Sequence, residues 1–244
     1  ESARGRTTAQ RQAREVTAGP RTWASLYQGR PSPDAGDLFP PEGDRYEQAL
    51  WLERPDGTRT IPGTGFELVQ SWDLAFKDTK GSDFVVGQVW LRIGADAYLV
   101  DQVRARLSFT KTLDAIRSMT ARWPQASAKF VEDKANGPAV INALARQIPG
   151  LIPVEPEGSK YARAAAVSPF VHSRNVHLPT AALLPNVEEL LEEARAFPNG
   201  AHDDTIDALS QALNRLLLMP LTEHDVVDEQ DFVDEDAHTY LGGY

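Results

Sequence analysis

Phe66-Glu67-Leu68-Val69-Gln70-Ser71-Trp72-Asp73 is the stretch that decides the fold, because it is an apolar strand pattern that ends at an acid. Glu132 ends a second apolar stretch, and Asp203, Asp204 and Asp207 open an apolar helix. Carboxylates that lie close together repel one another unless a cation lies between them. Hard divalent ions such as Mg²⁺ prefer oxygen ligands. These three acidic positions therefore predict a metal site suited to phosphoryl transfer.

The patterns on either side of this strand predict a mixed α/β domain. Strand patterns at 84–91 and 97–103 follow it after glycine-containing turns, which indicates an antiparallel meander. Farther along, helical patterns alternate with short apolar stretches at 129–132 and 151–154; the helical ranges are 109–123, 138–147, 159–168, 186–196 and 203–218. The order β-β-β-α-β-α-β-α-α is typical of a ribonuclease-H-like fold, in which helices flank a mixed sheet of a meander and parallel strands.

Composition favours a soluble intracellular protein. The chain has 244 residues, of which 41% are hydrophobic, so it can bury a substantial core. It has no cysteine, which excludes disulfides and zinc–thiolate sites and fits a reducing cytoplasm. No apolar run approaches the roughly 18 residues of a membrane helix, so we expect no membrane partner.

The acidic net charge does not exclude a nucleic-acid partner. The chain carries a net charge of −10, but eight acids and no Lys or Arg follow Leu221. Without these eight acids the net charge is −2, and without the five acids of the expected metal site the rest is slightly basic. We expect residues 221–244 to be a disordered acidic tail, or else a contact for a partner protein.

The N-terminal quarter reads as a linker. Six arginines precede Pro31, and Gly29-Arg30-Pro31-Ser32-Pro33 and Pro40-Pro41 interrupt regular structure. The sequence thus divides into a linker over 1–64, a folded domain over 65–220 and the tail over 221–244.

In a two-metal site, one carboxylate bridges two ions roughly 3.5–4 Å apart and other carboxylates hold each ion. Asp73, at the end of a buried strand, is our candidate for the bridging ligand, with Glu132 beside it. Asp204 and Asp207 share a helix face, whereas Asp203 points about 100° away. Taken singly, each acid also fits an ordinary role in a turn, a solvated loop or a helix N-terminus. Their joint occurrence favours the metal site.

Basic residues flank the acids in sequence. Singly they read as solvated surface charges, but together they suggest a track for DNA phosphates: Lys77, Lys80, Lys134, Lys160 and Arg163.

At these residues the chain resembles the nuclease domain of the large terminase subunit of tailed bacteriophages. The matching phrases span roughly residues 65–215 and are Trp72-Asp73-Leu74-Ala75, Val131-Glu132-Asp133-Lys134-Ala135-Asn136-Gly137-Pro138, Gly158-Ser159-Lys160-Tyr161-Ala162-Arg163-Ala164, Val176-His177-Leu178-Pro179 and His202-Asp203-Asp204-Thr205-Ile206-Asp207-Ala208. Residues 23–31 resemble the segment that joins the family's ATPase domain to its nuclease. The sequence contains no GxxxxGK[ST] motif, so we expect the ATPase domain to lie upstream of this piece.

The resemblance implies a catalytic role for the acids. It implies Mg²⁺- or Mn²⁺-dependent endonucleolytic cutting of concatemeric double-stranded viral DNA during genome packaging, in the cytoplasm of the host cell. Asp73 and Glu132 match the first two catalytic acids of the family, and the pair Asp203 and Asp204 matches the third. We prefer Asp204 as the direct ligand and keep Asp203 and Asp207 as alternatives. The implied partners are double-stranded DNA and the ATPase domain of the same chain, with the portal and the small terminase subunit as further candidates.

Two other functions fit parts of the pattern. A Holliday-junction-resolvase-like or integrase-like nuclease shares the fold and the acids, although the phrases at 158–163 and 176–179 and the linker at 27–31 favour terminase. A non-catalytic DNA-docking module of the packaging motor would keep the fold without cutting, and the presence of every acidic position speaks against it.

Overall fold

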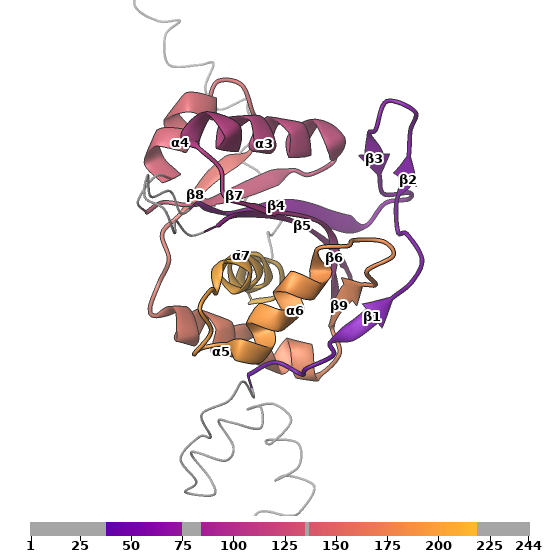
Figure 1. Ribbon diagram of the computed structural model, residues 1–244. Helices are drawn as coiled ribbons and strands as arrows, with labels where there is room; N and C mark the ends of the chain where they lie inside the picture. Colours follow the sequence, from indigo (N-terminus) through magenta and orange to yellow (C-terminus); the bar gives the residue numbers. More distant parts are fainter. Residues whose placement is uncertain (1–37, 75–83, 135–136, 219–244) are drawn as a thin grey trace, which may run out of the picture.

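The structure is a computed structural model that describes residues 38–74, 84–134 and 137–218. Its centre is a seven-stranded mixed sheet, whose strands lie in the order β1 (Asp44–Tyr46), β9 (Val176–Pro179), β6 (Asp96–Ala105), β5 (Val85–Ile93), β4 (Phe66–Leu74), β7 (Ala128–Glu132) and β8 (Leu151–Val154). Two helices cover one face, α3 (Phe109–Arg122) and α4 (Gly137–Leu144). Three cover the other, α5 (Lys160–His172), α6 (Val187–Ala196) and α7 (Asp204–Leu213), as Figure 1 shows. The predicted ribonuclease-H-like α/β architecture is confirmed.

The meander and the parallel strands both form as predicted. β4 pairs antiparallel with β5 along its whole length, and β5 pairs antiparallel with β6. β4 pairs in parallel with β7, and β7 in parallel with β8. Because helices cover both faces, the central strands are nearly continuous runs of buried residues.

Alternation along the strands divides the apolar side chains between two cores. Leu68, Trp72 and Val131 belong to the core beneath α3 and α4. Val69 and Phe130, their neighbours in sequence, belong to the core beneath α5, α6 and α7. Each fully buried aliphatic or aromatic side chain of this size contributes roughly 1.5–3 kcal/mol to stability.

Trp72 fits only because the neighbouring strand has a glycine opposite it. Trp72 pairs with Gly87 across the β4–β5 ladder. A Cβ atom at position 87 would lie 2.4 Å from Cζ3 of the Trp72 indole. Any side chain at 87 would therefore push the indole, and the strand that ends at Asp73, out of place.

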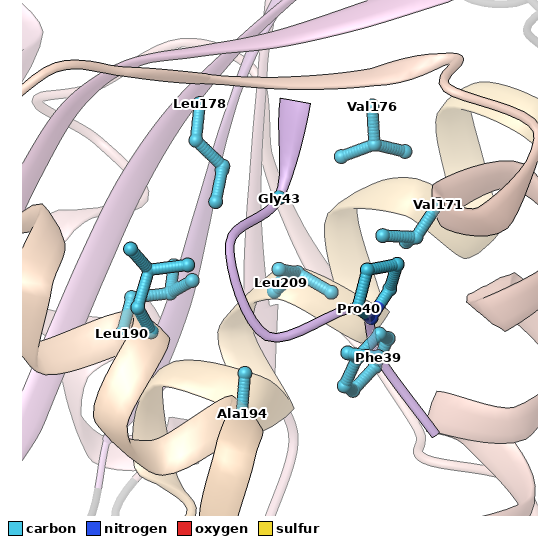
Figure 2. A pocket seen from close by; sticks show the side chains of 10 residues that line it. Phe39, Pro40, Gly43, Val171, Val176, Leu178, Leu190, Ala194 and Leu209 are labelled. Carbon is cyan, nitrogen blue, oxygen red and sulfur yellow. The ribbon is translucent and has the colours of Figure 1, made fainter. Parts of the chain in front are cut away.

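Part of the expected linker belongs to the folded domain. Leu38 and Phe39 are buried in the core beneath α5, α6 and α7, and the Ser168 hydroxyl donates a hydrogen bond to the Leu38 carbonyl. Phe39 and Pro40 line a small apolar cavity of about 20 Å³ with side chains from three helices (Figure 2): Val171 of α5, Leu190 and Ala194 of α6, and Leu209 of α7. The folded domain thus extends N-terminally to residue 38 at least.

The rest of this segment adds strands. β1 lies in parallel beside β9, so it covers what would otherwise be an open sheet edge. A small hairpin, β2 (Leu52–Glu53) and β3 (Arg59–Thr60), follows it. The break expected at Pro40-Pro41 interrupts regular structure only locally, because the apolar side chains before it insert into the core.

Some expected element boundaries differ from those observed. The helix expected over 138–147 ends at Leu144, and the helix expected over 159–168 continues to His172 despite Pro169. The helix expected over 203–218 is α7 followed by a π-helical turn, Asn214–Leu218. No strand was expected at β9, a four-residue strand that carries one of the phrases of the family resemblance.

Three further expectations lie outside the described residues: the linker over 1–37, the turn with Lys77 and Lys80, and the acidic tail. Within the described ranges, none of the helices combines the length and the apolar character that crossing a membrane requires.

Candidate metal centre

Asp73 and Glu132 lie at the same end of adjacent parallel strands. Trp72 of β4 pairs with Val131 of β7, so the two acids are the next residues along their strands. Ser71 and Phe130 face α7, and by alternation Asp73 and Glu132 point to that same side of the sheet. The metal-site hypothesis required these two strands to be neighbours, and the parallel β4–β7 pairing shows that they are.

A glycine lets the next helix begin close to Glu132. A Cβ atom at Gly137 would lie 1.9 Å from the Glu132 carbonyl oxygen. Only glycine allows this approach, and it lets α4 start immediately beyond the strand end that presents the carboxylate.

Hydrogen bonds hold α7 across β4 and β7. The Ser71 hydroxyl donates to the Ala208 carbonyl at 2.7 Å. One turn farther along α7, the Gln211 amide donates to the Ser71 hydroxyl at 2.9 Å and to the Phe130 carbonyl at 3.3 Å. These contacts place the first turn of α7 over the strand ends that carry Asp73 and Glu132.

The four acids Asp73, Glu132, Asp204 and Asp207 form one electrostatic cluster. Burial raises the pKa of Asp73 well above its ordinary value, and the carboxylates of Asp207, Glu132 and Asp204 raise it further. Burial and then Asp207 also raise the pKa of Glu132, while Arg163 and Lys134 oppose that shift. The structure therefore brings the three predicted acidic positions together.

The donor chemistry of this cluster fits a hard divalent ion, because every acid offers carboxylate oxygens and their mutual repulsion is what a cation relieves. Among residues 38–74, 84–134 and 137–218, no three acidic or histidine side chains are already arranged as a metal-binding group. The acids are close enough to raise one another's pKa but do not by themselves define an ion position.

Two expected phosphate-binding residues instead contact the acids of α7. Lys160 Nζ lies 2.7 Å from Asp203 Oδ1 and 2.5 Å from Asp207 Oδ2. Arg163 Nη2 lies 2.7 Å from Asp207 Oδ1. Burial disfavours the charged form of Lys160, but the hydrogen bonds to Asp203 and Asp207 outweigh it and raise the Lys160 pKa. Both carboxylate oxygens of Asp207 thus have a cationic partner.

Asp204 is buried at the first position of α7. Its Oδ2 accepts a hydrogen bond from the Phe84 backbone N–H at 3.3 Å. His202 Nδ1 lies 3.9 Å from the same oxygen, and its ring packs edge-on against Phe84 with centroids 5.0 Å apart. His202 therefore lies beside Asp204, the candidate metal ligand. Lys134, which was also expected to contact phosphate, is exposed near Glu132.

The sequence analysis did not identify the residues of α6 and β6 that hold the first turn of α7. Glu193 of α6 is buried, and its Oε2 accepts hydrogen bonds from the Thr205 backbone N–H and hydroxyl. Its Oε1 accepts a hydrogen bond from the Arg104 guanidinium of β6. One signal was available: Glu193 comes three residues after Leu190, on the buried stripe of its helix, where an unpaired charge is rarely found.

The family model of the terminase RNase-H-like domain matches residues 70–216, which is more than half of the chain. The chain belongs to this terminase family. The match runs from β4 through α7, so every acid of the candidate metal centre lies inside the terminase domain.

Solved terminase structures share the fold. The large terminase of a thermophilic bacteriophage, in complex with ADP, is 9% identical, with a TM-score of 0.61 over 88% of this chain and 53% of that chain. The nuclease of the large terminase from the thermophilic phage G20c, with bound magnesium, is 15% identical (TM-score 0.51, 76% of this chain, 99% of that one). The large terminase nuclease domain from the bacteriophage SPP1, with bound Mn, is 14% identical, with a TM-score of 0.50 over 72% of this chain and 98% of that chain.

At these identities the likeness shows the fold alone. This chain spans about half of the ADP-bound terminase and nearly all of the G20c and SPP1 nucleases. A search of curated proteins gave no match.

Proposed function

We propose that this chain is a metal-dependent endonuclease domain that cuts concatemeric double-stranded viral DNA during genome packaging. The observation that carries the proposal is the meeting of Asp73 and Glu132, on adjacent parallel strand ends, with the acids of α7 in a terminase-family fold. Mg²⁺ and Mn²⁺ are the ions we propose; the G20c nuclease structure has bound magnesium and the SPP1 nuclease structure has bound Mn.

We assign the ion-holding role to Asp73, Glu132 and Asp204. When bound, divalent ions would activate a water molecule and stabilise the oxygen that leaves the phosphodiester. The carboxylates of Glu132, Asp204 and Asp207 all raise the pKa of Asp73, and this central position suits a bridging ligand. Asp203 and Asp207 are second choices because Lys160 contacts both and Arg163 contacts Asp207 as well.

The basic residues have two roles in this proposal. Lys160 and Arg163 offset the charge of α7 and hold its first turn in place. Lys134 is exposed two residues after Glu132, and we assign it a contact with a DNA phosphate next to the cut. Lys77 and Lys80 remain candidates for the same phosphate track.

We further propose that this domain works with an ATPase domain of the same chain, in the cytoplasm of the infected cell. The length of the ADP-bound terminase supports this, because this chain spans about half of it. The portal and the small terminase subunit stay proposals that follow from the family alone.

Plasmid nicking tests the proposal. The parent chain should convert supercoiled plasmid to open-circular and linear forms in Mn²⁺ or Mg²⁺ but not in a chelator. Asp73→Asn and Glu132→Gln should each lower the rate by at least about 100-fold, because each removes a charge-stabilising group from the reacting centre. Asp114→Asn is the matched control, since Asp114 is an exposed acid of α3 on the opposite face of the sheet. Equal rates for all four proteins would refute the assignment.

The same preparation distinguishes a terminase-like nuclease from a junction resolvase. A terminase-like domain should cut linear duplex and a four-way junction at similar rates. A strong preference for the junction would favour the resolvase function.

A further inference from the structure

A cavity of about 490 Å³ opens directly beside the candidate metal centre. Glu132 and Asp207 form part of its lining. The remainder comes from β8 and the residues after it, from α5, from α7 and from the π-helical turn that follows α7. Figure 1 shows α5 and α7 on the same face of the sheet. Its volume lies in the range of roughly 300–1,000 Å³ typical of sites that hold a small molecule.

The cavity lies where an open α/β sheet normally binds its ligand. β4, β7 and β8 are parallel neighbours, and their carboxyl ends follow one another along a single edge of the sheet. The crevice outside the carboxyl ends of parallel strands is the usual ligand position in such sheets. If one phosphate of a DNA strand lies at Asp73 and Glu132, the neighbouring nucleotide of that strand would therefore lie next to the cavity.

Apolar side chains and nitrogen donors line the cavity together. The lining includes the apolar residues Ile152, Pro153 and Val154. It also includes Arg163, whose Nη2 contacts Asp207 Oδ1, and Arg215. The Arg215 Nε is buried and has no hydrogen-bond acceptor among the described residues, although its guanidinium lies 5.3 Å from the centre of the Phe130 ring. This Nε is closed off from the cavity, so a ligand there meets the mixed apolar and polar lining and not this donor.

The charges of the lining favour a base over a phosphate. Glu155 and Glu157 join Glu132 and Asp207, so four acids face two arginines. A second phosphate would be repelled there. A neutral base, in contrast, offers a flat apolar surface and ring atoms that accept hydrogen bonds from arginine. The amino groups of adenine and cytosine can also donate hydrogen bonds to a carboxylate.

We propose that this cavity is a subsite for one unstacked base of the DNA strand next to the phosphate that is cut. The inference rests on the proposed nuclease function and adds that the duplex must open locally at the cutting position. Taking a base out of the stack costs free energy, and the cost is lowest where the base is already mismatched or single-stranded. The cavity therefore makes cutting sensitive to local melting of the duplex.

Ala166→Leu tests the subsite without touching the acids. Ala166 lines the cavity from an exposed position of α5, so a leucine there narrows the cavity without a penalty to the helix. Ala121→Leu is the matched control, because Ala121 is an exposed alanine of α3 on the opposite face of the sheet. Thermal unfolding of both variants should match the parent.

The first measurement uses the fluorescence of 2-aminopurine, which rises when the base leaves the stack. A duplex with one 2-aminopurine opposite a mismatch is titrated with protein in Ca²⁺. We expect a saturable rise with the parent and with Ala121→Leu, and at least about a five-fold weaker response with Ala166→Leu. No rise with the parent, or an equal rise with Ala166→Leu, overturns the subsite.

The second measurement uses plasmid cutting in Mn²⁺. Ala166→Leu should raise the KM for DNA several-fold and leave the metal dependence at its parental value, since the acids are intact. A parent that cuts, together with an Ala166→Leu variant of unchanged KM, overturns the subsite and leaves the nuclease standing. A parent that never cuts overturns the nuclease, and the fluorescence titration then still decides whether the cavity holds a base.

Discussion

The carboxylate of Glu193 accepts two hydrogen bonds from Thr205, one from its backbone N–H at 2.9 Å and one from its hydroxyl at 2.5 Å. Glu193 thereby caps the N-terminus of α7 from a different helix. Asp203, which occupies the N-cap position itself, makes no capping hydrogen bond with its side chain. Because Glu193 caps the helix start, the Asp203 side chain contacts Lys160 instead of the helix backbone.

Glu193→Gln should destabilise the domain. Glutamine keeps one acceptor for Thr205 but removes the charge that holds Arg104, whose Nη2 lies 2.6 Å from Glu193 Oε1. The loss of this charged hydrogen bond should lower the free energy of unfolding by about 1–3 kcal/mol, measured in urea. Glu192→Gln, at the exposed neighbouring position, should leave it within about 0.5 kcal/mol of the parent.

The same variant should need more Mn²⁺ to cut DNA. The loosened first turn of α7 would hold Asp204 less firmly, and supporting residues of this kind typically change metal affinity by about 10–100-fold. A Glu193→Gln variant that loses stability but keeps the parental Mn²⁺ requirement would show that Glu193 supports the fold without positioning the acid.

Lys160→Met should make stability depend more strongly on divalent ions. Lys160 contacts both Asp203 and Asp207, so its removal leaves two carboxylates of α7 with less compensating charge. Without ions, thermal unfolding should begin at a lower temperature than in the parent. Added Mg²⁺ should raise the variant's Tm by more than it raises the parent's. Lys111→Met, at an exposed position of α3, should respond to Mg²⁺ as the parent does.

The ion-free protein should lose stability as the pH rises above about 4. Burial, followed by the neighbouring carboxylates, raises the folded-state pKa of Asp73 above its unfolded value, which is near 3.9. Between those two pKa values the folded protein binds more protons than the unfolded chain, so the free energy of unfolding falls with increasing pH. Glu132 and Asp207 shift in the same direction and add to the slope.

Urea titrations between pH 4 and pH 8 in a chelator measure this slope, and Asp73→Asn isolates one acid. The variant has no proton to lose at position 73, so its stability should fall less steeply with pH than that of the parent. Saturating Mg²⁺ should flatten the parent's profile. A parent whose stability rises throughout this range in the chelator would contradict the cluster.

Local pattern was enough to predict the central strands and their acids. β4 and β7 are apolar stretches that end at Asp73 and Glu132, and the metal-site hypothesis required them to be neighbours, as their parallel pairing shows. β1 and β9 were not predicted, because Asp-Arg-Tyr and Val-His-Leu-Pro mix polar and apolar residues over a short length, whereas the equally short β8 is an apolar run. The ion pairs of Lys160 and Arg163 depend on how α5 lies against α7, which no single stretch of sequence specifies.

Phe39→Ala tests whether the folded domain begins before residue 65. The Phe39 side chain is buried among α5, α6 and α7, and its removal should lower the free energy of unfolding by about 3–5 kcal/mol. Leu52→Ala, whose side chain is 63% exposed in the β2–β3 hairpin, should change it by less than about 0.5 kcal/mol. A chain that starts at residue 38 should unfold like the parent in urea, whereas a chain that starts at residue 65 should be markedly less stable because it lacks β1 and Phe39. Equal stability of the two shortened chains would show that residues 38–64 belong to the linker and not to the folded domain.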